Sequence, residues 1–291
     1  MASYPQAGPG FVDTVSGKSP FGEIVLGTII ILITVTLFFT TEGLYSASKV
    51  MSSRFQHLMD YTANADDKAL VIHQDSSKYN DAKPVLPSNN EPSGSEFAYS
   101  FYLYINSTTF DTGSDVLHHV WHKGYGCVWP LMGPGVFVKG SSNTLRVVMN
   151  TYENPYAFVD VPNIPVRKWF HVVLNCRQGS SGGLEVHING NLTNKIRFDN
   201  TLPYLNYEDI VLFSSANFTL NSQTPALNGN TLQVNGAFKG MMSEFIYTQY
   251  AMSFTEIQTL YHAGPSKKIK TTAQELPPYL ADTWWTSSYS S

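Results

Sequence analysis

Two segments decide the fold class of this chain: WFHVVLNC, residues 169–176, and LEVHINGNLTNKI, residues 184–196. Both have the apolar and β-branched content of strands that turn one face toward a core. In the second segment, Asn189 and Gly190 stand between two strand-like arms. This pair supplies the two positive-φ residues that a type I′ turn needs. The segments therefore predict an antiparallel hairpin beside a further strand.

More segments of the same kind lie on either side. In FAYSFYLYI, residues 97–105, every second side chain is large and apolar, so one face of a strand is predicted to be buried. Further strand-like segments are LHHVWHK, GVFVK, TLRVVMN, AFVDV, DIVLF and GMMSEFIYTQ, all separated by turn residues. Short strands at short spacing predict a mainly β, antiparallel sandwich rather than βαβ units.

One short helix is predicted near the C-terminus. Ser253 and Glu256 have the spacing of a capping box, and Gly264 followed by Pro265 ends the helix.

The N-terminal part contains a different signal. Between Ile24 and Thr41 the sequence IVLGTIIILITVTLFFTT carries no charge, and as a helix it reaches about 27 Å, close to the hydrocarbon thickness of a bilayer. The residues before it lack the basic start of a signal peptide, which favours a retained single-pass anchor. Loose helical spacing after it predicts a juxtamembrane helical segment over residues 42–66.

The chain is therefore expected to have five parts. These are an N-terminal tail (1–23), a transmembrane helix (24–41), the juxtamembrane segment (42–66), a β-sandwich (67–265) with a Pro- and Ser-rich loop (75–95), and a C-terminal tail (266–291).

Basic residues give a preference for orientation. Lys18 precedes the anchor, whereas Lys49 and Arg54 follow it, so the positive-inside rule places the C-terminal domain on the cytosolic face. The two cysteines form no disulfide framework, in keeping with that face. Glycosylation sequons at Asn106, Asn191 and Asn217 would stay unmodified there.

Composition argues against one class of partner. A net charge of −4 gives no electrostatic reason to expect nucleic acid.

The segments WFHVVLNC and LEVHINGNL resemble the core of concanavalin A-like (LamG-type) domains. The segment FKGMMSEFIYTQYAMSFTEIQTLYHAG, residues 238–264, is similar to that family's closing strand and following helix, and WHKG, residues 121–124, matches its early Lys-Gly. The resemblance covers about residues 69–264 and implies an antiparallel jelly roll. It also implies sugar binding, glycan hydrolysis or plain adhesion as functions.

An enzyme is not expected. Glycoside hydrolysis needs two carboxyl groups about 5–10 Å apart, whereas the adjacent Glu208 and Asp209 would point to opposite faces of a strand. No serine-hydrolase, metalloprotease or P-loop motif is present either.

Aromatic residues offer candidates for glycan stacking: Trp121, Tyr125, Trp129 and Tyr152. The simpler interpretation is that they fill the sandwich core. Asn and Asp side chains in loops could hold Ca²⁺, although no calcium-loop pattern stands out, and no other cofactor is expected. His118 and His122 would share a strand face about 13 Å apart, too far to bind one zinc ion.

The C-terminal tail contains Tyr279 and the adjacent pair Trp284 and Trp285, which are candidate contacts with a partner protein. An anchor, a domain without catalytic motifs and such a tail together resemble the membrane-associated minor capsid proteins of large icosahedral DNA viruses. The predicted function is therefore a non-enzymatic virion protein that links an inner membrane to capsid or other assembly proteins. The alternative is a membrane-tethered, lectin-like adhesion protein that binds glycans.

Overall fold

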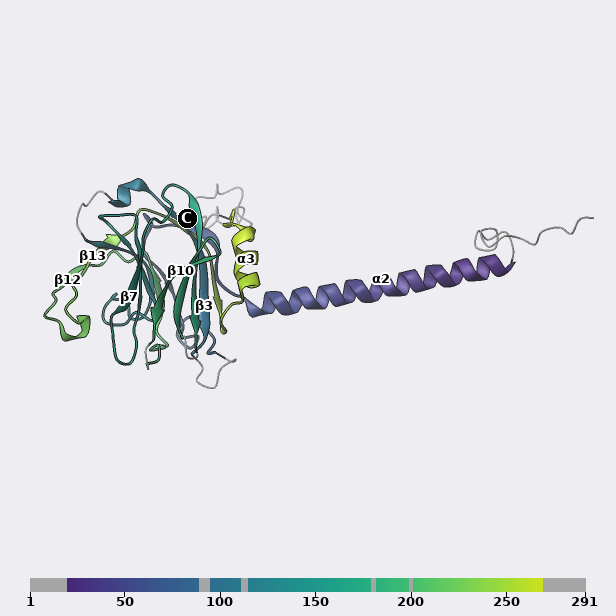
Figure 1. The fold of residues 1–291 in the computed structure, drawn as a ribbon, viewed down its shortest axis with the longest axis horizontal. Coiled ribbons are helices and arrows are strands. Elements are labelled where there is room, and N and C mark those ends of the chain that lie inside the picture. Colours follow the sequence, from purple (N-terminus) through teal and green to yellow (C-terminus); the bar gives the residue numbers. More distant parts are fainter. Residues whose placement is uncertain (1–19, 89–94, 111–114, 179–181, 199–200, 269–291) are drawn as a thin grey trace, which may run out of the picture. The chain divides into compact units, whose positions relative to one another are not determined.

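A computed structural model describes residues 20–88, 95–110, 115–178, 182–198 and 201–268 of the chain. The chain divides into two units between Arg54 and Phe55. Figure 1 shows both units, a long helix and a β-rich domain.

The first unit is helix α2, Pro20–Arg54, which contains the predicted span. Its segment Phe21–Tyr45 is long and apolar enough to cross a membrane, and a signal sequence near an N-terminus would have the same character. All five threonine hydroxyls between Ile24 and Thr41 donate to a backbone carbonyl one turn earlier, for example Thr28 Oγ1 to Ile24 O at 2.8 Å. Because lipid offers no hydrogen-bond partner, these internal bonds make the segment compatible with a bilayer interior.

The second unit contains two β-sheets (Figure 1). The first sheet is antiparallel throughout, in the order β1, β14, β3, β8, β9, β10. Its strands are β1 (Gln56–Asn64), β3 (Phe97–Ile105), β8 (Trp169–Arg177), β9 (Gly183–Ile188), β10 (Asn191–Arg197) and β14 (Gly240–Thr248).

The second sheet follows the order β12, β13, β4, β5, β6, β7, and β11 pairs with both β4 and β2. Only the β13–β4 pair is parallel among the described strands. Its strands are β2 (Leu70–Ile72), β4 (Leu117–Lys123), β5 (Gly135–Lys139), β6 (Leu145–Met149), β7 (Ala157–Val161), β11 (Ile210–Leu212), β12 (Asn217–Leu220) and β13 (Leu232–Ala237). Two 3₁₀ turns, Ser107–Phe110 and Pro225–Leu227, lie in the connections.

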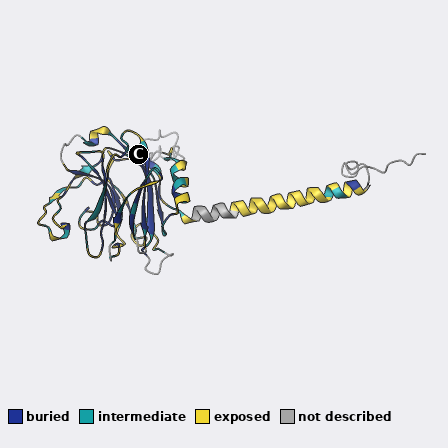
Figure 2. Cartoon of the chain, in the orientation of Figure 1, coloured by how far each residue is buried: buried dark blue, intermediate teal, exposed yellow. Residues whose placement is uncertain are grey.

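The core lies between the two sheets. Phe101 of β3, Trp121 of β4 and Phe245 of β14 belong to one buried cluster, and the Trp121 ring centroid lies 4.8 Å from that of Phe245. Burial of such rings is a large share of the apolar area that stabilises a domain of this size. Figure 2 shows the strands as the buried part of the domain.

Helix α3, Phe254–Ala263, covers the outer face of the first sheet. Ser253 and Glu256 form the predicted capping box. Ile257 packs on Ala98 and Val173, and the Tyr102 hydroxyl donates to the Leu260 carbonyl. The predicted mainly β fold with an N-terminal apolar helix and a short C-terminal helix is confirmed.

One expected segment is wrong. The prediction of a helical segment over residues 42–66 fails after Arg54, because Gln56–Asn64 is edge strand β1. Its pairing with β14 shifts register between His57 and Met59 and again between Met59 and Thr62. These irregularities bury Leu58, Met59, Thr62 and Ala63, a spacing that imitates one face of a helix.

Candidate functional site

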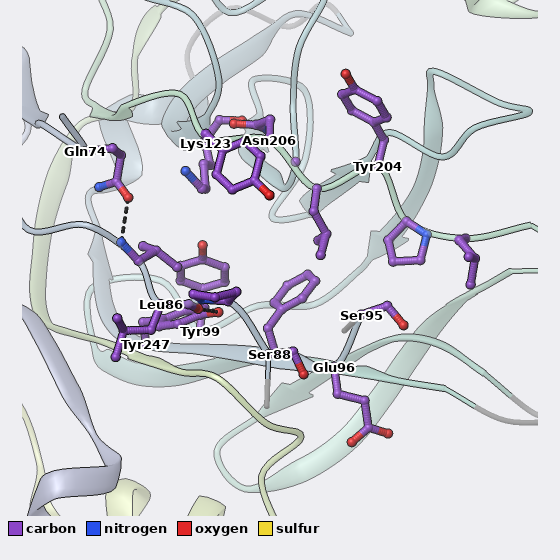
Figure 3. A pocket seen from close by; sticks show the side chains of 18 of the residues that line it. Gln74, Leu86, Ser88, Ser95, Glu96, Tyr99, Lys123, Tyr204, Asn206 and Tyr247 are labelled. Carbon is purple, nitrogen blue, oxygen red and sulfur yellow. Dashed lines mark hydrogen bonds between the residues drawn. The ribbon is translucent and has the colours of Figure 1, made fainter. Parts of the chain in front are cut away.

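The clearest concave site is a cavity of about 650 Å³ at one end of the sandwich (Figure 3). That volume is in the range that holds a drug-sized ligand. The cavity also gathers exposed apolar side chains. The β domain has eleven large hydrophobic residues that are exposed among those described, and six of them line the cavity: Leu86, Tyr152, Leu202, Tyr204, Leu205 and Tyr207.

One wall is the chain from Pro84 to Ser88. Gln74 accepts a hydrogen bond from the Val85 backbone N–H at 2.8 Å, drawn in Figure 3, and Gln56 donates to the Pro84 carbonyl at 2.7 Å. The Tyr247 hydroxyl donates to the Leu86 carbonyl at 2.7 Å. These three bonds fix the wall to the sheets, so it is preformed.

The opposite wall comes from the chain before β11. Tyr204 N–H donates to the Asn150 carbonyl at 2.8 Å, and Asn206 Nδ2 donates to the Lys123 carbonyl at 3.1 Å. Gly133 lies directly beneath this wall, where an added Cβ would come within 2.7 Å of Asn206 Nδ2. Tyr152 and Tyr204 meet edge to face, with ring centroids 5.3 Å apart.

The floor is aromatic. Phe97 and Tyr99 of β3 and Tyr247 of β14 all line the cavity and belong to the main core cluster. Burial raises the pKa of both tyrosines well above the ordinary value, so they stay neutral hydrogen-bonding groups.

Lys123, at the end of β4, is the one cation in the lining. It is only 5% exposed, and its Nζ donates to the Glu208 carbonyl at 2.5 Å. Burial lowers its pKa to about 8, although the charges of Asp209 and Glu208 oppose this shift. In Figure 3, Lys123 and Asn206 lie together, away from Ser95 and Glu96.

The carboxylate of Asp209 is already committed elsewhere. It accepts from His73 Nδ1 and from the Gln74 backbone N–H, both at 2.8 Å. Glu208 has an exposed side chain, so the two adjacent carboxylates do not form a catalytic pair within the cavity. Ser88 Oγ, in contrast, is a buried atom of the lining without a hydrogen-bond partner in the described structure.

The predicted stacking residues fall into different environments. Trp121 is 0% exposed in the core, so its assignment as a glycan-stacking residue is wrong. Trp129 is half-buried against Tyr156, and Tyr125 is exposed but is not part of the cavity lining. Tyr152 lines the cavity. The tail candidates Tyr279, Trp284 and Trp285 lie outside the described residues.

The histidines of β4 depart from strict alternation. A register shift between His119 and Trp121 brings His119 and His122, rather than His118 and His122, onto one side. His118 Nδ1 instead lies 2.8 Å from the Asn235 carbonyl oxygen. Within the described ranges, no group of three His, Cys, Asp or Glu residues is arranged to hold a metal ion.

Most of the cavity residues were not singled out from the sequence. Tyr204, Asn206 and Tyr207 belong to no motif, and Lys123 stood out only as part of the WHKG segment of the family resemblance. The stretch between residues 84 and 88 has the composition of an ordinary loop. The one local signal is YLNY, residues 204–207, a cluster of exposed aromatics just before a strand.

Comparisons with known proteins give distant structural similarities. No family model matches the chain, and no curated protein matches it. The receptor-binding domain of botulinum neurotoxin D superposes with a TM-score of 0.48 and 11% identity, covering 70% of this chain and 44% of that one. The binding domain of Paraclostridial Mosquitocidal Protein 1 gives 0.45 and 11%, covering 69% and 42%.

A third structure, the binding domain of botulinum neurotoxin DC in complex with SialylT, gives a TM-score of 0.41 and 15% identity, covering 60% of this chain and 38% of that one. The chain thus spans less than half the length of these solved chains. At these values the similarities say nothing about what the cavity binds. The concanavalin A-like and capsid assignments stay predictions.

Proposed function

We propose that the protein is a membrane-anchored, non-enzymatic carbohydrate-binding protein, whose ligand occupies the tyrosine-lined cavity. The observation that supports this is the concentration of exposed aromatic residues there: Tyr152, Tyr204 and Tyr207 at the mouth, with Tyr207 91% exposed. Sugar rings present apolar C–H faces and a polar edge, so they suit tyrosines, which combine a ring face with a hydroxyl.

The polar groups of the lining fit the same ligand class. Ser88 Oγ has no partner among the described residues, and a buried hydroxyl left alone costs about 1–3 kcal/mol. A sugar hydroxyl entering the cavity would supply the missing partner. The concanavalin A-like resemblance is in keeping with this proposal, and helix α2 would hold the domain at a membrane.

A glycan array tests the proposal directly. The full chain, kept in a detergent without a sugar headgroup, should bind a defined subset of saccharides. Tyr152→Ala and Tyr204→Ala should weaken binding at least tenfold, with little change in thermal stability because both side chains are exposed. Tyr125→Ala is the matched control, since this exposed tyrosine lies outside the lining. Absence of any saccharide binding, or equal loss in the control, would contradict the proposal.

A second candidate function is the virion linker, which rests on the aromatic pair Trp284 and Trp285 in the tail. Burying each of these side chains in a partner would contribute roughly 2–4 kcal/mol. Truncation after Leu280 should then weaken incorporation into a particle while leaving saccharide binding intact. Assembly at the wild-type level would remove the support for this role.

Orientation separates the two candidates. Asn191 of β10 and Asn217 of β12 are both exposed, so their sequons are accessible to glycosylation if the domain faces the lumen. Cys127 and Cys176 are free thiols. A mass shift on enzymatic deglycosylation favours the lectin-like protein, whereas unmodified sequons and reduced thiols favour the linker.

A further inference from the structure

We infer that the cavity recognises an acidic saccharide, and that Lys123 binds the carboxylate of that ligand. The inference rests on the proposed carbohydrate-binding function and narrows it to a ligand class. It is carried by the position and bonding of one buried ammonium group.

Lys123 is buried without a carboxylate in direct contact, although the charges of Asp209 and Glu208 act on it from further away. Its Nζ donates one hydrogen bond to the Glu208 carbonyl, and no carboxylate of the described residues lies within 4 Å of Nζ. Other lysines of the domain do form direct ion pairs, for example Lys139, whose Nζ lies 2.8 Å from a carboxylate oxygen of Asp160. A buried cation is costly unless it is paired, so the missing anion is a feature to explain.

The neighbouring acid does not fill this role. Both oxygens of Asp209 accept hydrogen bonds, from His73 and from the Gln74 backbone. An ammonium has three donor positions, and one is used by the Glu208 carbonyl. The remaining donors are available to a group in the cavity that Lys123 lines.

The charged residues of the lining indicate how many negative charges the ligand carries. Of the twenty lining residues only Lys123 and Glu96 carry a charge. A single ammonium complements one negative charge, whereas Glu96 would oppose a second. A carboxylate therefore suits the cavity better than a phosphate monoester, which carries close to two negative charges at pH 7.

The position of Lys123 also orients the ligand. It lies beside Asn206 (Figure 3), which belongs to the same wall as Tyr204 and Tyr207. A sugar ring on those tyrosines would direct its carboxylate toward the buried end, where low polarity strengthens the ionic hydrogen bond.

Matched saccharides test the inference. The methyl glycoside of galacturonic acid and 3′-sialyllactose each carry one carboxylate, and each differs from its methyl ester in charge but hardly in shape. Calorimetric titration of the full chain at pH 7 should show at least tenfold tighter binding of an acidic form than of its ester. Lys123→Met should abolish that preference and leave the ester's affinity within twofold. Lys168→Met, a loss of charge at an exposed lysine outside the lining, should change neither affinity.

A pH titration of the unaltered protein gives an independent check, which matters if Lys123→Met fails to fold. The affinity for the acidic form should fall between pH 7 and 9 as Lys123 loses its proton, while the affinity for the ester stays constant. Equal affinity for acid and ester, or a preference that survives Lys123→Met, would overturn the acidic ligand but leave carbohydrate binding standing. Absence of binding to any saccharide overturns both.

Discussion

His119 and His122 form a direct hydrogen bond inside the sandwich, with 2.7 Å between His119 Nε2 and His122 Nδ1. The Ser214 backbone N–H donates to His119 Nδ1 at 3.0 Å, so His119 carries its proton on Nε2 and donates it to His122. His122 in turn donates from Nε2 to the Tyr125 carbonyl at 2.8 Å. This one-directional chain requires both rings to be neutral. Burial lowers the pKa of both, most strongly for His119.

Buried neutral histidines predict instability in acid. Burial lowers the pKa of His171 to about 4, from an ordinary 6.5. Above pH 6.5 the ring is neutral in both the folded and the unfolded state. As the pH falls below 6.5, the unfolded chain binds protons that the folded domain does not, and stability is lost progressively down to about pH 4. For His171 alone the loss is about 3 kcal/mol, and the other buried histidines add to it.

Urea unfolding at several pH values, followed by tryptophan fluorescence, measures this loss. His171→Gln keeps a hydrogen-bonding group beside Ser100 and should flatten the pH dependence of the unfolding free energy. The exposed His262 provides the control variant, His262→Gln, which should keep the wild-type dependence. A folded domain whose stability is the same at pH 7 and pH 4.5 would show that these rings do not stay neutral.

Gly133 is predicted to set the shape of the cavity wall. In Gly133→Ala the new Cβ would lie 2.7 Å from Asn206 Nδ2 and 2.9 Å from the Tyr204 carbonyl oxygen. Because the second contact is with backbone, the wall must move, at a cost of about 1–3 kcal/mol in stability. Saccharide binding should weaken as Tyr204 is displaced. Gly126→Ala meets no atom within 4 Å and should leave both stability and binding unchanged.

The strands that sequence patterns predicted well are those with one clearly buried face. Segment 97–105 is β3, and the segments 117–123 and 135–139 coincide with β4 and β5. Strand β1 could not be recognised because two register shifts destroy its alternation. Strands β12 and β13 were not predicted either, because both are short and rich in polar residues, and because Gly236 interrupts β13.

Most of the residues that line the cavity could not be predicted from the sequence. Its walls come from two loops more than one hundred residues apart, and neither loop carries a periodic pattern. Trp121 was a reasonable stacking candidate by residue type, but its position on the inner face of β4 buries it. The bulge after His119 likewise decides which histidines meet, and such a bulge depends on the pairing partner rather than on local sequence.

The hairpin turn gives a prediction about stability. Gly190 has φ +80°, and an added Cβ would lie 2.4 Å from Gln258 Nε2 of α3. Gly190→Val should therefore destabilise the domain by about 1 kcal/mol or more, through backbone strain and through displacement of Gln258, which donates to the Gly190 carbonyl at 3.0 Å. Gly229 has the same φ of +80° with no atom near its Cβ position, so Gly229→Val isolates the strain. A smaller effect at Gly190 than at Gly229 would contradict the coupling to α3.

The final prediction concerns α2. If residues 24–41 span a bilayer once, the protein should remain in the membrane pellet at high pH in carbonate and leave it only with detergent. The internal bonds of the five threonines remove the polar penalty that would otherwise oppose insertion. A chain that lacks residues 20–45 is the control and should be released by carbonate alone. Sequencing the N-terminus of the mature protein separates an anchor from a signal sequence. A mature chain that begins after Tyr45, or full-length protein released without detergent, would show that this helix is not a retained membrane anchor.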